Sequence, residues 1–559
     1  MIIPQPRSTS LLLLVLGLAG GLDAQRGSRL WRPDERVVLT DFGVVDAVAA
    51  DETVVYVVTR GGIAVYDPRF RRWLPPITRV DGFTPQRTWA ALVDPTDRSL
   101  WLATERGLIN YAPQLQRFES IWDVGRATQL MFDRADAFAG IYVRVGADWR
   151  FLPRGGTIAQ PAHSLPAPDR QVRALTAQEA LRRFPYLSAM RAGILTDQRL
   201  RTYRYTAAAT VPGTDEVFLG TDGLGLVRFD AASSDAELLR FGLLGMGAGG
   251  IAVVPGGVWV GSGALGGLGG RSGLTFVGSD LQQFEFVEPR GNLGATRVVY
   301  DVLYHAGKLW AAGETGVSLT DGGRELRRLA SNAELPGDRV YALAAAQGGV
   351  WAGTDRGLAF IADGGTVDRV GGYGPGAVVA LAARGDTVWV GTQSGLGVLL
   401  PGEDRIVVPS SVAQLAELAE PIVALAFSGD ILAVATRDRI LWRGAESGEP
   451  GAGWTVEPPV SGRLGTLTAV VGDAGGGIWL GGERGMASYR FATRQFTFFA
   501  TPGDLPGVVR DLAVDEQYVW VATDGGVVRF DRRAVEGPRA GSGERGAESG
   551  EQRAGSGER

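Results

Sequence analysis

The side chains that could carry chemistry in this sequence are few, and their types limit the reactions that they could support. Histidine occurs twice, as His163 and His305, and the two lie in different parts of the chain, so we expect no shared site. A metal centre built from histidine is therefore excluded, and we expect no cofactor. Cysteine is absent from the 559 residues, which removes disulfides, thiolate ligands, a cysteine nucleophile and a lipoprotein anchor.

Carboxylates are the second candidate chemistry, because acidic residues recur at the tips of predicted turns: Glu105, Asp222, Glu314, Asp355, Asp438, Glu483 and Asp524. A glycoside hydrolase needs only two carboxylates at a suitable separation. Acidic side chains also favour tight turns for backbone reasons, and this preference alone accounts for their positions. A polysaccharide-active enzyme therefore stays open as an alternative, and we assign no catalytic residue.

The same turns predict a binding surface, because equivalent turns of a repeat architecture point to one face. We expect a rim of mixed charge there, formed by Arg60, Glu105, Arg106, Asp222, Glu314, Asp355, Arg356, Arg437, Asp438, Glu483, Arg484 and Asp524. Alternating arginine and acid suits a glycan, a peptide or a protein partner through charge-assisted hydrogen bonds. A merely solvated surface has the same composition.

A glycine-rich run, Gly261–Gly270, superficially resembles a phosphate-binding loop. It lacks the Lys-Ser/Thr ending, and no helical pattern follows it. We therefore expect a long hairpin here instead.

An internal repeat positions these residues. The clearest copies are Trp101-Leu-Ala-Thr-Glu-Arg-Gly-Leu108, Phe218-Leu-Gly-Thr-Asp-Gly-Leu224, Trp351-Ala-Gly-Thr-Asp-Arg-Gly-Leu358 and Trp389-Val-Gly-Thr-Gln-Ser-Gly-Leu396. Looser copies bring the number to about eleven, at a period of about 40 to 45 residues. Each unit has an apolar segment, the aromatic segment, a third alternating segment and a fourth such as Gln495–Phe499. Four short strands per period predict an all-β fold, a β-propeller of about eleven four-stranded blades.

The conserved spacing within each copy has a structural explanation that needs no ligand. The leading aromatic residue can fill the wedge between adjoining blades. Glycine supplies the positive φ of a tight hairpin, and the threonine before it can bond its hydroxyl to the turn backbone.

The two ends of the chain complement each other. Glu35–Phe42 has the pattern of a fourth strand with no preceding three, whereas Val509–Asp531 supplies three strands and no fourth. Pairing them would close a ring and bury two exposed strand edges. We expect two side-by-side propellers, at residues 28–290 and 291–535, with the first in effect inserted into the second.

Two segments depart from the repeat. Residues 154–200 form an insertion that contains Thr176–Arg183, which has a capping-box start for a short helix. Inserted loops on repeat scaffolds are frequent places for binding, but packing or decoration is their commoner role. The tail, residues 536–559, is rich in Gly, Ser, Glu and Arg and has no large apolar residue, so we expect it to be disordered.

Composition and targeting signals limit the functional class. The apolar content of 45% predicts a folded protein, and its formal net charge of -5 makes nucleic acid a poor partner. Arg7, the apolar run 11–18 and a small residue at Ala24 predict a signal peptide at residues 1–24. Because no later apolar run reaches about 18 residues, we expect an exported periplasmic or extracellular protein without a transmembrane segment in the mature chain.

The Trp-x-Gly-Thr-x-x-Gly-Leu copies resemble two-component regulator propeller repeats. That family includes periplasmic sensor halves of hybrid histidine kinases and standalone secreted proteins. The resemblance covers about 500 residues and implies a propeller with a sensor role. This chain has no kinase module, so signalling would require a partner protein. The sequence also resembles, more loosely, the paired-propeller component of a bacterial protein secretion system.

From these observations we expect an exported β-propeller binding or interaction module, sensor-like or scaffolding, that recognises a polar ligand or a protein partner on a propeller face. One alternative is the polysaccharide-active enzyme with paired carboxylates. The other is a component of envelope assembly or protein secretion.

Overall fold

The computed structural model describes residues 31–536, with gaps at 185–186, 188–192, 231, 234, 264–270, 289–297, 322–324, 331–333, 371–375 and 445–452. The expected signal peptide and residues 537–559 of the expected tail lie outside the described residues. Antiparallel strands form eleven sheets in the described part of the chain, which confirms the all-β, propeller-like fold. No helix among these residues has both the length and the apolar character needed to cross a membrane.

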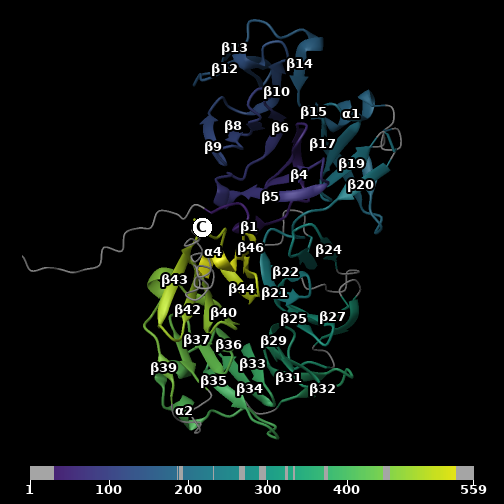
Figure 1. The fold of residues 1–559 in the computed structure, drawn as a ribbon. Coiled ribbons are helices and arrows are strands. Elements are labelled where there is room, and N and C mark those ends of the chain that lie inside the picture. The colour runs from purple at the N-terminus through teal and green to yellow at the C-terminus, as the bar shows by residue number, and fades with distance from the viewer. Residues whose placement is uncertain are drawn as a thin grey trace, which may run out of the picture. The chain divides into compact units, whose positions relative to one another are not determined.

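Four sheets lie between Val45 and Leu239, and we call them the first set (Figure 1). Their strands are β2 (Val45–Ala50), β3 (Val55–Thr59), β4 (Gly62–Asp67) and β5 (Arg72–Thr78); β6 (Thr88–Val93), β7 (Leu100–Thr104), β8 (Gly107–Ala112) and β9 (Arg117–Trp122); β10 (Ala127–Asp133), β11 (Gly140–Val145), β12 (Asp148–Pro153), β13 (Gln160–Pro161) and β14 (Gln171–Arg173); and β15 (Leu175–Thr176), β16 (Ile194–Thr196), β17 (Thr202–Thr210), β18 (Glu216–Thr221), β19 (Leu226–Asp230) and β20 (Asp235–Leu239).

Seven further sheets form the second set, which uses the first described strand, β1 (Arg36–Leu39), and all strands after Ala248. These are β21 (Ala248–Val254), β22 (Gly257–Ser262), β23 (Leu274–Gly278) and β24 (Phe284–Val287); β25 (Val299–His305), β26 (Lys308–Gly313), β27 (Gly316–Thr320) and β28 (Glu325–Leu329); β29 (Val340–Ala346), β30 (Gly349–Thr354), β31 (Gly357–Ala362) and β32 (Val367–Arg369); β33 (Val378–Arg384), β34 (Thr387–Thr392) and β35 (Gly395–Leu399); β36 (Ala424–Ser428), β37 (Ile431–Ala435), β38 (Ile440–Arg443) and β39 (Thr455–Val456); β40 (Leu467–Asp473), β41 (Gly477–Gly482), β42 (Gly485–Arg490) and β43 (Gln495–Ala500); and β44 (Val509–Val514), β45 (Tyr518–Thr523) and β46 (Gly526–Asp531).

Helices in the described residues are short. They are α1 (Ala177–Arg183), α2 (Ser410–Ala413), α3 (Ser461–Leu464) and α4 (Arg532–Glu536).

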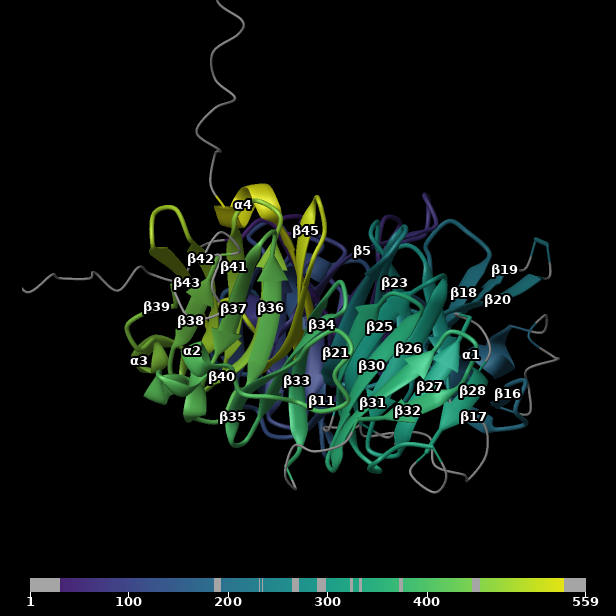
Figure 2. The same ribbon diagram turned by 90° about the horizontal axis from the view of Figure 1, so that it is seen from below.

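The second set closes on itself through the first strand of each sheet. β21 contacts β25, and contacts continue in order through β29, β33, β36 and β40 to β44, which returns to β21. Figure 2 shows these successive sheets beside one another. In the first set β17 contacts β2, β2 contacts β6, and β6 contacts β10. The circle is completed there by residues 171–176, because β14 pairs with β10 and β15 pairs with β17.

The N-terminal strand completes the last sheet, as the sequence predicts. β1 pairs antiparallel with β46, in a register that places Val38 opposite Val528 and Leu39 opposite Val527. Leu39 and Val527 are fully buried. The pairing therefore joins the two ends of the described chain in one sheet and shields the edge of β46 from solvent.

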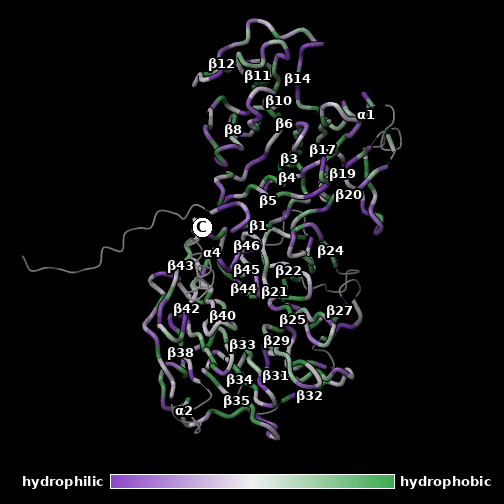
Figure 3. Tube along the Cα trace, viewed as in Figure 1, coloured by the Kyte–Doolittle hydropathy of each residue, from purple (hydrophilic) through white to green (hydrophobic). Residues whose placement is uncertain are grey.

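The leading aromatic residues pack between adjacent sheets, which confirms their predicted role as wedges. Trp479 of β41 shares a hydrophobic cluster with Leu512 and Val519 of the next sheet. Trp310 shares one with Val350. Trp520 lies in the cluster that contains Val258. Hydrophobic residues recur along the strands of both sets (Figure 3), and the core consists of these contacts between sheets.

The predicted threonine–glycine device recurs in the turn after the second strand. The hydroxyl of Thr104 donates to the Gly107 carbonyl over 2.8 Å, and Thr523 donates to Gly526 over 2.8 Å. Both threonines are fully buried. Gly107 and Gly526 have positive φ angles of 139° and 132°, so the two conserved positions act together on one turn.

The insertion in the first set has a packing role. Helix α1 starts with the predicted capping box, in which the Thr176 hydroxyl accepts from the Glu179 amide over 3.2 Å. Ala180 and Leu181 of this helix share a hydrophobic cluster with Leu219 and Phe229 of the adjacent sheet. The helix therefore covers apolar residues of that sheet where the repeat pattern is interrupted.

Two connections join the sets and run side by side. Residues 40–44 lead from β1 to β2, and residues 240–247 lead from β20 to β21. Asp41 pairs antiparallel with Gly242, and the Leu243 amide donates to the Thr40 carbonyl over 2.8 Å. A Cβ atom at Gly242 would lie 2.3 Å from that carbonyl oxygen, so this close approach requires glycine.

The contacts of β21 bear on the boundary expected near residue 290. Because β21 packs against β25 and β44, the sheet from β21 to β24 neighbours the later sheets. We therefore propose that the boundary between the two propellers lies between β20 and β21 instead of between residues 290 and 291.

Three sheets depart from the expected four strands. Two sheets of the first set, those that contain β10 and β17, have five and six strands. The sheet of β33, β34 and β35 has three. Beyond Leu399 the chain contains Pro401, and the backbone returns only for a single bridge between Val398 and Val407.

Candidate functional site

All twelve predicted rim residues lie in turns between the second and third main strands of their sheets. Several of these turns contact the start of the innermost strand of their own sheet. The Glu105 amide donates to the Arg87 carbonyl, and the Asp355 and Asp524 amides donate to the carbonyls of Arg339 and Val508. These bonds hold the turns in equivalent positions on the sheets.

Three of the rim side chains pair with residues outside the predicted set. Asp524 accepts two hydrogen bonds of 2.7 Å from Arg510, Arg60 lies 3.9 Å from Asp46, and Asp438 pairs with Arg439 at 3.0 Å. Among the residues that the structure describes, no ion pair joins two of the twelve. These three rim residues are thus paired locally and not with one another.

The two histidines lie in separate elements, as expected. His305 ends β25, with its Nε2 atom 3.9 Å from Asp363 Oδ1. His163 lies in the insertion, between β13 and β14. Within the described ranges, no group of three or more His, Asp or Glu residues is placed to hold a metal ion.

Two carboxylates on inner strands of the second set were not singled out by the sequence. Asp511 of β44 accepts from the Ile251 amide over 2.9 Å, and Asp301 of β25 accepts from the Leu343 amide over 2.6 Å. Each side chain therefore ties its strand to the inner strand of a neighbouring sheet. Both aspartates lie next to a shift in strand register. One strand carries an extra residue there, which changes the direction in which its side chains point.

Burial raises the pKa of Asp301 to about 7. Burial, together with the charge of Asp301, also raises the pKa of Asp511 well above its ordinary value. An acid with a raised folded-state pKa holds its proton in the folded protein at a pH where the unfolded chain has released it. Its contribution to stability is therefore present at low pH and is lost as pH rises from about 4 to about 7.

We accordingly expect Asp301→Asn to reduce the loss of stability between about pH 5 and pH 8. The amide keeps an oxygen that can accept from Leu343, but it cannot ionise. Urea unfolding at both pH values measures the effect, with Asp386→Asn, an exposed acid in a hairpin, as the matched control. An equal pH dependence in the wild type and in Asp301→Asn would contradict this assignment.

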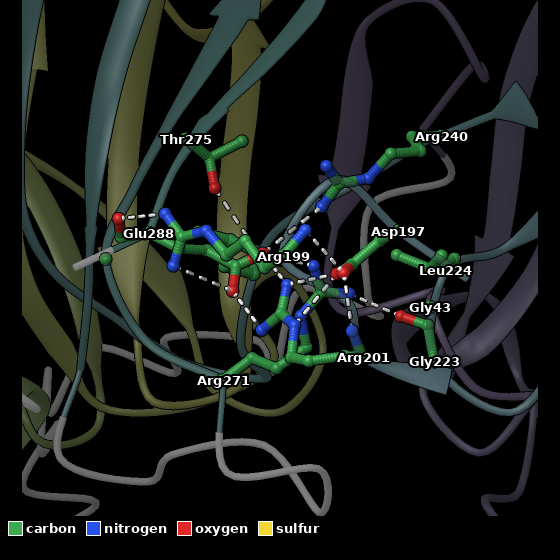
Figure 4. A network of polar contacts seen from close by, with 12 residues as sticks. Gly43, Asp197, Arg199, Arg201, Gly223, Leu224, Arg240, Arg271, Thr275 and Glu288 are labelled. Carbon is green, nitrogen blue, oxygen red and sulfur yellow. Dashed lines mark hydrogen bonds and ion pairs between the residues drawn. The ribbon is translucent and has the colours of Figure 1, made fainter. Parts of the chain in front are cut away.

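Six charged side chains line a pocket of about 830 Å³ where the two sets meet. It is lined by Leu195, Thr196, Asp197, Gln198, Arg199, Arg201, Leu224, Leu238, Arg240, Arg271, Phe286 and Glu288. We call it the arginine pocket. Figure 4 shows its arginines gathered around Glu288 and Asp197.

A tight hairpin between β16 and β17 positions the first part of the arginine pocket. One carboxylate oxygen of Asp197 accepts from the backbone amides of Arg199 and Arg201, each over 2.9 Å. Leu200, between them, has a positive φ of 62°. The other Asp197 oxygen accepts from Arg201 Nε over 2.8 Å. The hairpin thus presents two arginines from a backbone that its own aspartate fixes.

Glu288, directly after β24, is the carboxylate on which the arginines converge. It accepts from Arg201 over 2.6 Å and 3.2 Å and from Arg271, and its backbone carbonyl accepts from Arg199 over 2.5 Å. Burial acts to raise the pKa of Glu288, but the bonds from Arg201 and Arg271 outweigh burial and lower it to about 2. Glu288 is therefore ionised throughout the neutral range.

Arg240, at the start of the second connection, is less well compensated. Its guanidinium stacks 3.6 Å from the Phe286 ring centroid and lies 4.0 Å from Glu288 Oε1. Burial and the charge of Arg271 lower its pKa to about 10. Arg271 donates to the Gly223 carbonyl as well as to Glu288. Arg240 and Arg271 therefore place two positive charges beside Glu288.

Three parts of the arginine pocket lie in or beside segments that the sequence analysis singled out. Its first hairpin begins at the end of the insertion, residues 154–200, and Arg271 follows the glycine-rich run. Leu224 shares a turn with Asp222, one of the twelve rim residues. The four arginines themselves were missed, because each lies in an irregular segment outside the repeat. An excess of arginine at the borders of the insertion and of the glycine-rich run was the available signal.

This fold places the chain in the class of propeller-like, all-β proteins, with a charged pocket where its two sets of sheets join. No family model matches the chain, and no curated protein matches its sequence. Among solved structures it is similar to PorZ, an essential surface component of the type-IX secretion system of Porphyromonas gingivalis. The identity is 12% over 89% of this chain and 87% of that chain, with a TM-score of 0.54.

Two further solved structures match with lower scores. One is the extracellular domain of the one-component system BT4673 from B. thetaiotaomicron, at 14% identity over 86% of this chain and 69% of that chain, with a TM-score of 0.34. The other is virginiamycin B lyase from Staphylococcus aureus, at 14% identity over 52% of this chain and 97% of that chain, with a TM-score of 0.41. The likeness to PorZ agrees with the propeller-like fold.

Proposed function

We propose that the protein is an exported β-propeller binding module, sensor-like or scaffolding, that holds a polar ligand or a protein partner outside the cytoplasm. The observation that carries this proposal is the arginine pocket, which has a volume of about 830 Å³ and is lined by charged side chains from both sets of sheets. Pockets of this size suit small ligands or the anchoring group of a larger partner. The repeat residues, by contrast, are occupied with packing.

The twelve rim residues are our proposed second contact surface for a protein partner. Their turns are held in equivalent positions by backbone bonds, and many of their charged ends are exposed. Such a surface favours orientation and specificity of docking over affinity. We propose that a partner engages the rim while a ligand occupies the arginine pocket.

A role in envelope assembly or protein secretion is the second candidate. It is supported by the likeness to PorZ, which is a surface component of a secretion system and matches over 87% of its length. Co-purification of wild-type protein with an envelope complex, and its loss when Asp355 and Arg356 of the rim are reversed in charge, would favour this role. A freely soluble monomer without partners in the same fractions would count against it.

Binding without turnover distinguishes the proposal from the polysaccharide-active alternative. We expect purified protein incubated with xylan, pectin or alginate to release no reducing ends above a boiled sample. Release at a steady rate that depends on protein concentration would contradict the binding-only function. The double variant Asp301→Asn and Asp511→Asn would then show whether the inner-strand aspartates are responsible.

A further inference from the structure

We propose that the arginine pocket binds an organic oxyanion, a carboxylate or phosphate attached to an apolar ring or chain. This inference deepens the proposed function by assigning a chemical class to the ligand of that same site. It stands on the arrangement of Arg240, Arg271, Glu288 and the apolar residues beside them.

The charge lining the pocket is unbalanced. Four arginines face two carboxylates, Asp197 and Glu288, so the lining has two more positive than negative groups. Asp41, in the first connection, contributes a third carboxyl group nearby, whose pKa is raised by burial. The chain as a whole carries a net charge of -5. A local excess of cations in an acidic protein attracts anions to this place.

Structural pairing explains only part of this set. Glu288 is occupied by bidentate Arg201 and by Arg271, and Asp197 is occupied by Arg201 and its own backbone turn. Arg240 lies beyond hydrogen-bonding distance of Glu288, at 4.0 Å. Its side chain is only 25% exposed. A buried cation without a close carboxylate is costly, and an anion beside it would remove that cost.

Arg271 supplies a second donor. Its side chain is 14% exposed, and its Nε atom is buried without a hydrogen-bond partner among the described residues. A buried, unpaired donor on a cation is a feature that a bound acceptor would satisfy. Arg240 and Arg271 lie close enough for the charge of one to lower the pKa of the other, so a single oxyanion placed beside both would be stabilised by both charges.

The remaining lining specifies the uncharged part of the ligand. Leu195, Leu224, Leu238 and Phe286 line the same pocket as the arginines. Phe286 carries Arg240 against its ring, which fixes the guanidinium plane on an aromatic surface. Since leucine side chains offer no hydrogen bonds, burial of apolar ligand surface is what they contribute. An oxyanion with an adjoining ring or chain matches both parts.

Isothermal titration calorimetry of the full chain with three probes tests this inference: inorganic phosphate, phenyl phosphate and benzoate. We expect phenyl phosphate, benzoate or both to bind, and the tighter of the two identifies the preferred oxyanion. We expect inorganic phosphate to bind about tenfold or more weakly than phenyl phosphate, because it lacks the ring. Equal affinity for phosphate and phenyl phosphate, or no heat from either organic probe at millimolar concentration, would overturn the inference.

The variant Arg240→Gln should weaken binding of the organic probe by about ten- to a hundredfold. Arg443→Gln is the matched control, because Arg443 is also stacked on aromatic rings, Trp389 and Trp454, and burial also lowers its pKa, but it lies on β38. We expect Arg443→Gln to bind as the wild type does. Equal affinity in the wild type and Arg240→Gln would overturn the inference.

A second pocket variant keeps the inference testable if Arg240→Gln fails to fold. Arg199→Gln changes a side chain that is 37% exposed, and unchanged near-UV circular dichroism would establish that it folds. It should weaken the probe as well. If a natural partner still binds while Arg240→Gln has no effect on any probe, the oxyanion inference fails and the binding function survives. If neither a partner nor a probe binds, both fail.

Discussion

Replacing Gly526 by alanine is expected to lower the free energy of unfolding by about 2–5 kcal/mol. Gly526 has a φ of 132°, a conformation that alanine adopts only with strain. A Cβ atom there would lie 2.1 Å from the Leu39 carbonyl oxygen. That oxygen belongs to β1, so the added methyl group would push away the strand that closes the second set. Urea unfolding followed by tryptophan fluorescence measures the change.

Gly348→Ala is the matched control for this variant. Gly348 also has a positive φ, of 77°, but no atom lies within 4 Å of a Cβ placed there. It therefore carries the backbone strain alone, about 1–2 kcal/mol. If both variants lose the same stability, the Leu39 contact contributes nothing and β1 does not close the sheet as described.

Replacing Trp479 by alanine is expected to cost about 3–5 kcal/mol. The side chain is fully buried and fills the space between two sheets, where it shares a cluster with Leu512, Val519 and Phe499. Its truncation would leave a cavity that rigid neighbouring sheets cannot collapse into. Chemical denaturation reports the loss, and a shift of the unfolding midpoint with an unchanged slope would localise it to the folded state.

The indole nitrogen of Trp479 separates packing from hydrogen bonding. Within the described part of the chain, this buried Nε1 atom has no hydrogen-bond partner. Trp479→Phe should therefore lose much less than Trp479→Ala, because it keeps a ring and breaks no bond. Phe70→Ala, at a residue that is 73% exposed, should change stability by less than about 0.5 kcal/mol. Similar losses in all three variants would contradict the wedge role.

The repeat made most of the fold predictable. Trp, Thr and Gly recur because each sheet needs an aromatic wedge, a hydroxyl bond to the turn and a residue with positive φ. Each copy of the repeat therefore indicates one sheet. The pairing of β1 with the last sheet could also be predicted from the sequence. Glu35–Phe42 has the pattern of a strand without three preceding strands, and Val509–Asp531 supplies three strands without a fourth. The helix α1 followed from its capping box, which is a local signal.

The arginine pocket was not predictable in the same way. Its charged residues come from separate segments of the chain, and the two connections that pair beside it, 40–44 and 240–247, are about 200 residues apart in the sequence. Arg201 and Glu288 form their ion pair across 87 positions. Neither residue belongs to a repeated position, so nothing in the spacing indicates the contact. The expected boundary between the two propellers, near residue 290, was based on the composition of that segment. The contacts of β21 depend instead on which strand edges meet in the folded chain.

The insertion of one set of sheets into the other explains why a pocket forms at this place. A ring interrupted between β1 and β21 must send two chains across to the inserted sheets, and these connections carry Asp41 and Arg240. The hairpin of Asp197, the segment between β22 and β23 that carries Arg271, and the end of β24 contribute the other charges. The proposed ligand site is therefore a consequence of the chain order, while the repeats supply rigid support on both sides.

Because the arginine pocket depends on that chain order, the pairing of β1 with β46 is the feature to test most directly. The chain has no cysteine, so the double variant Val38→Cys and Val528→Cys introduces one unique pair at positions that face each other in the register. Leu512→Cys with Val521→Cys, opposite each other on β44 and β45 of the same sheet, controls for oxidation. After mild oxidation, we expect a cross-link that shifts the mobility of the first pair on a non-reducing gel. Oxidation of the control pair without any cross-link between positions 38 and 528 would contradict this pairing.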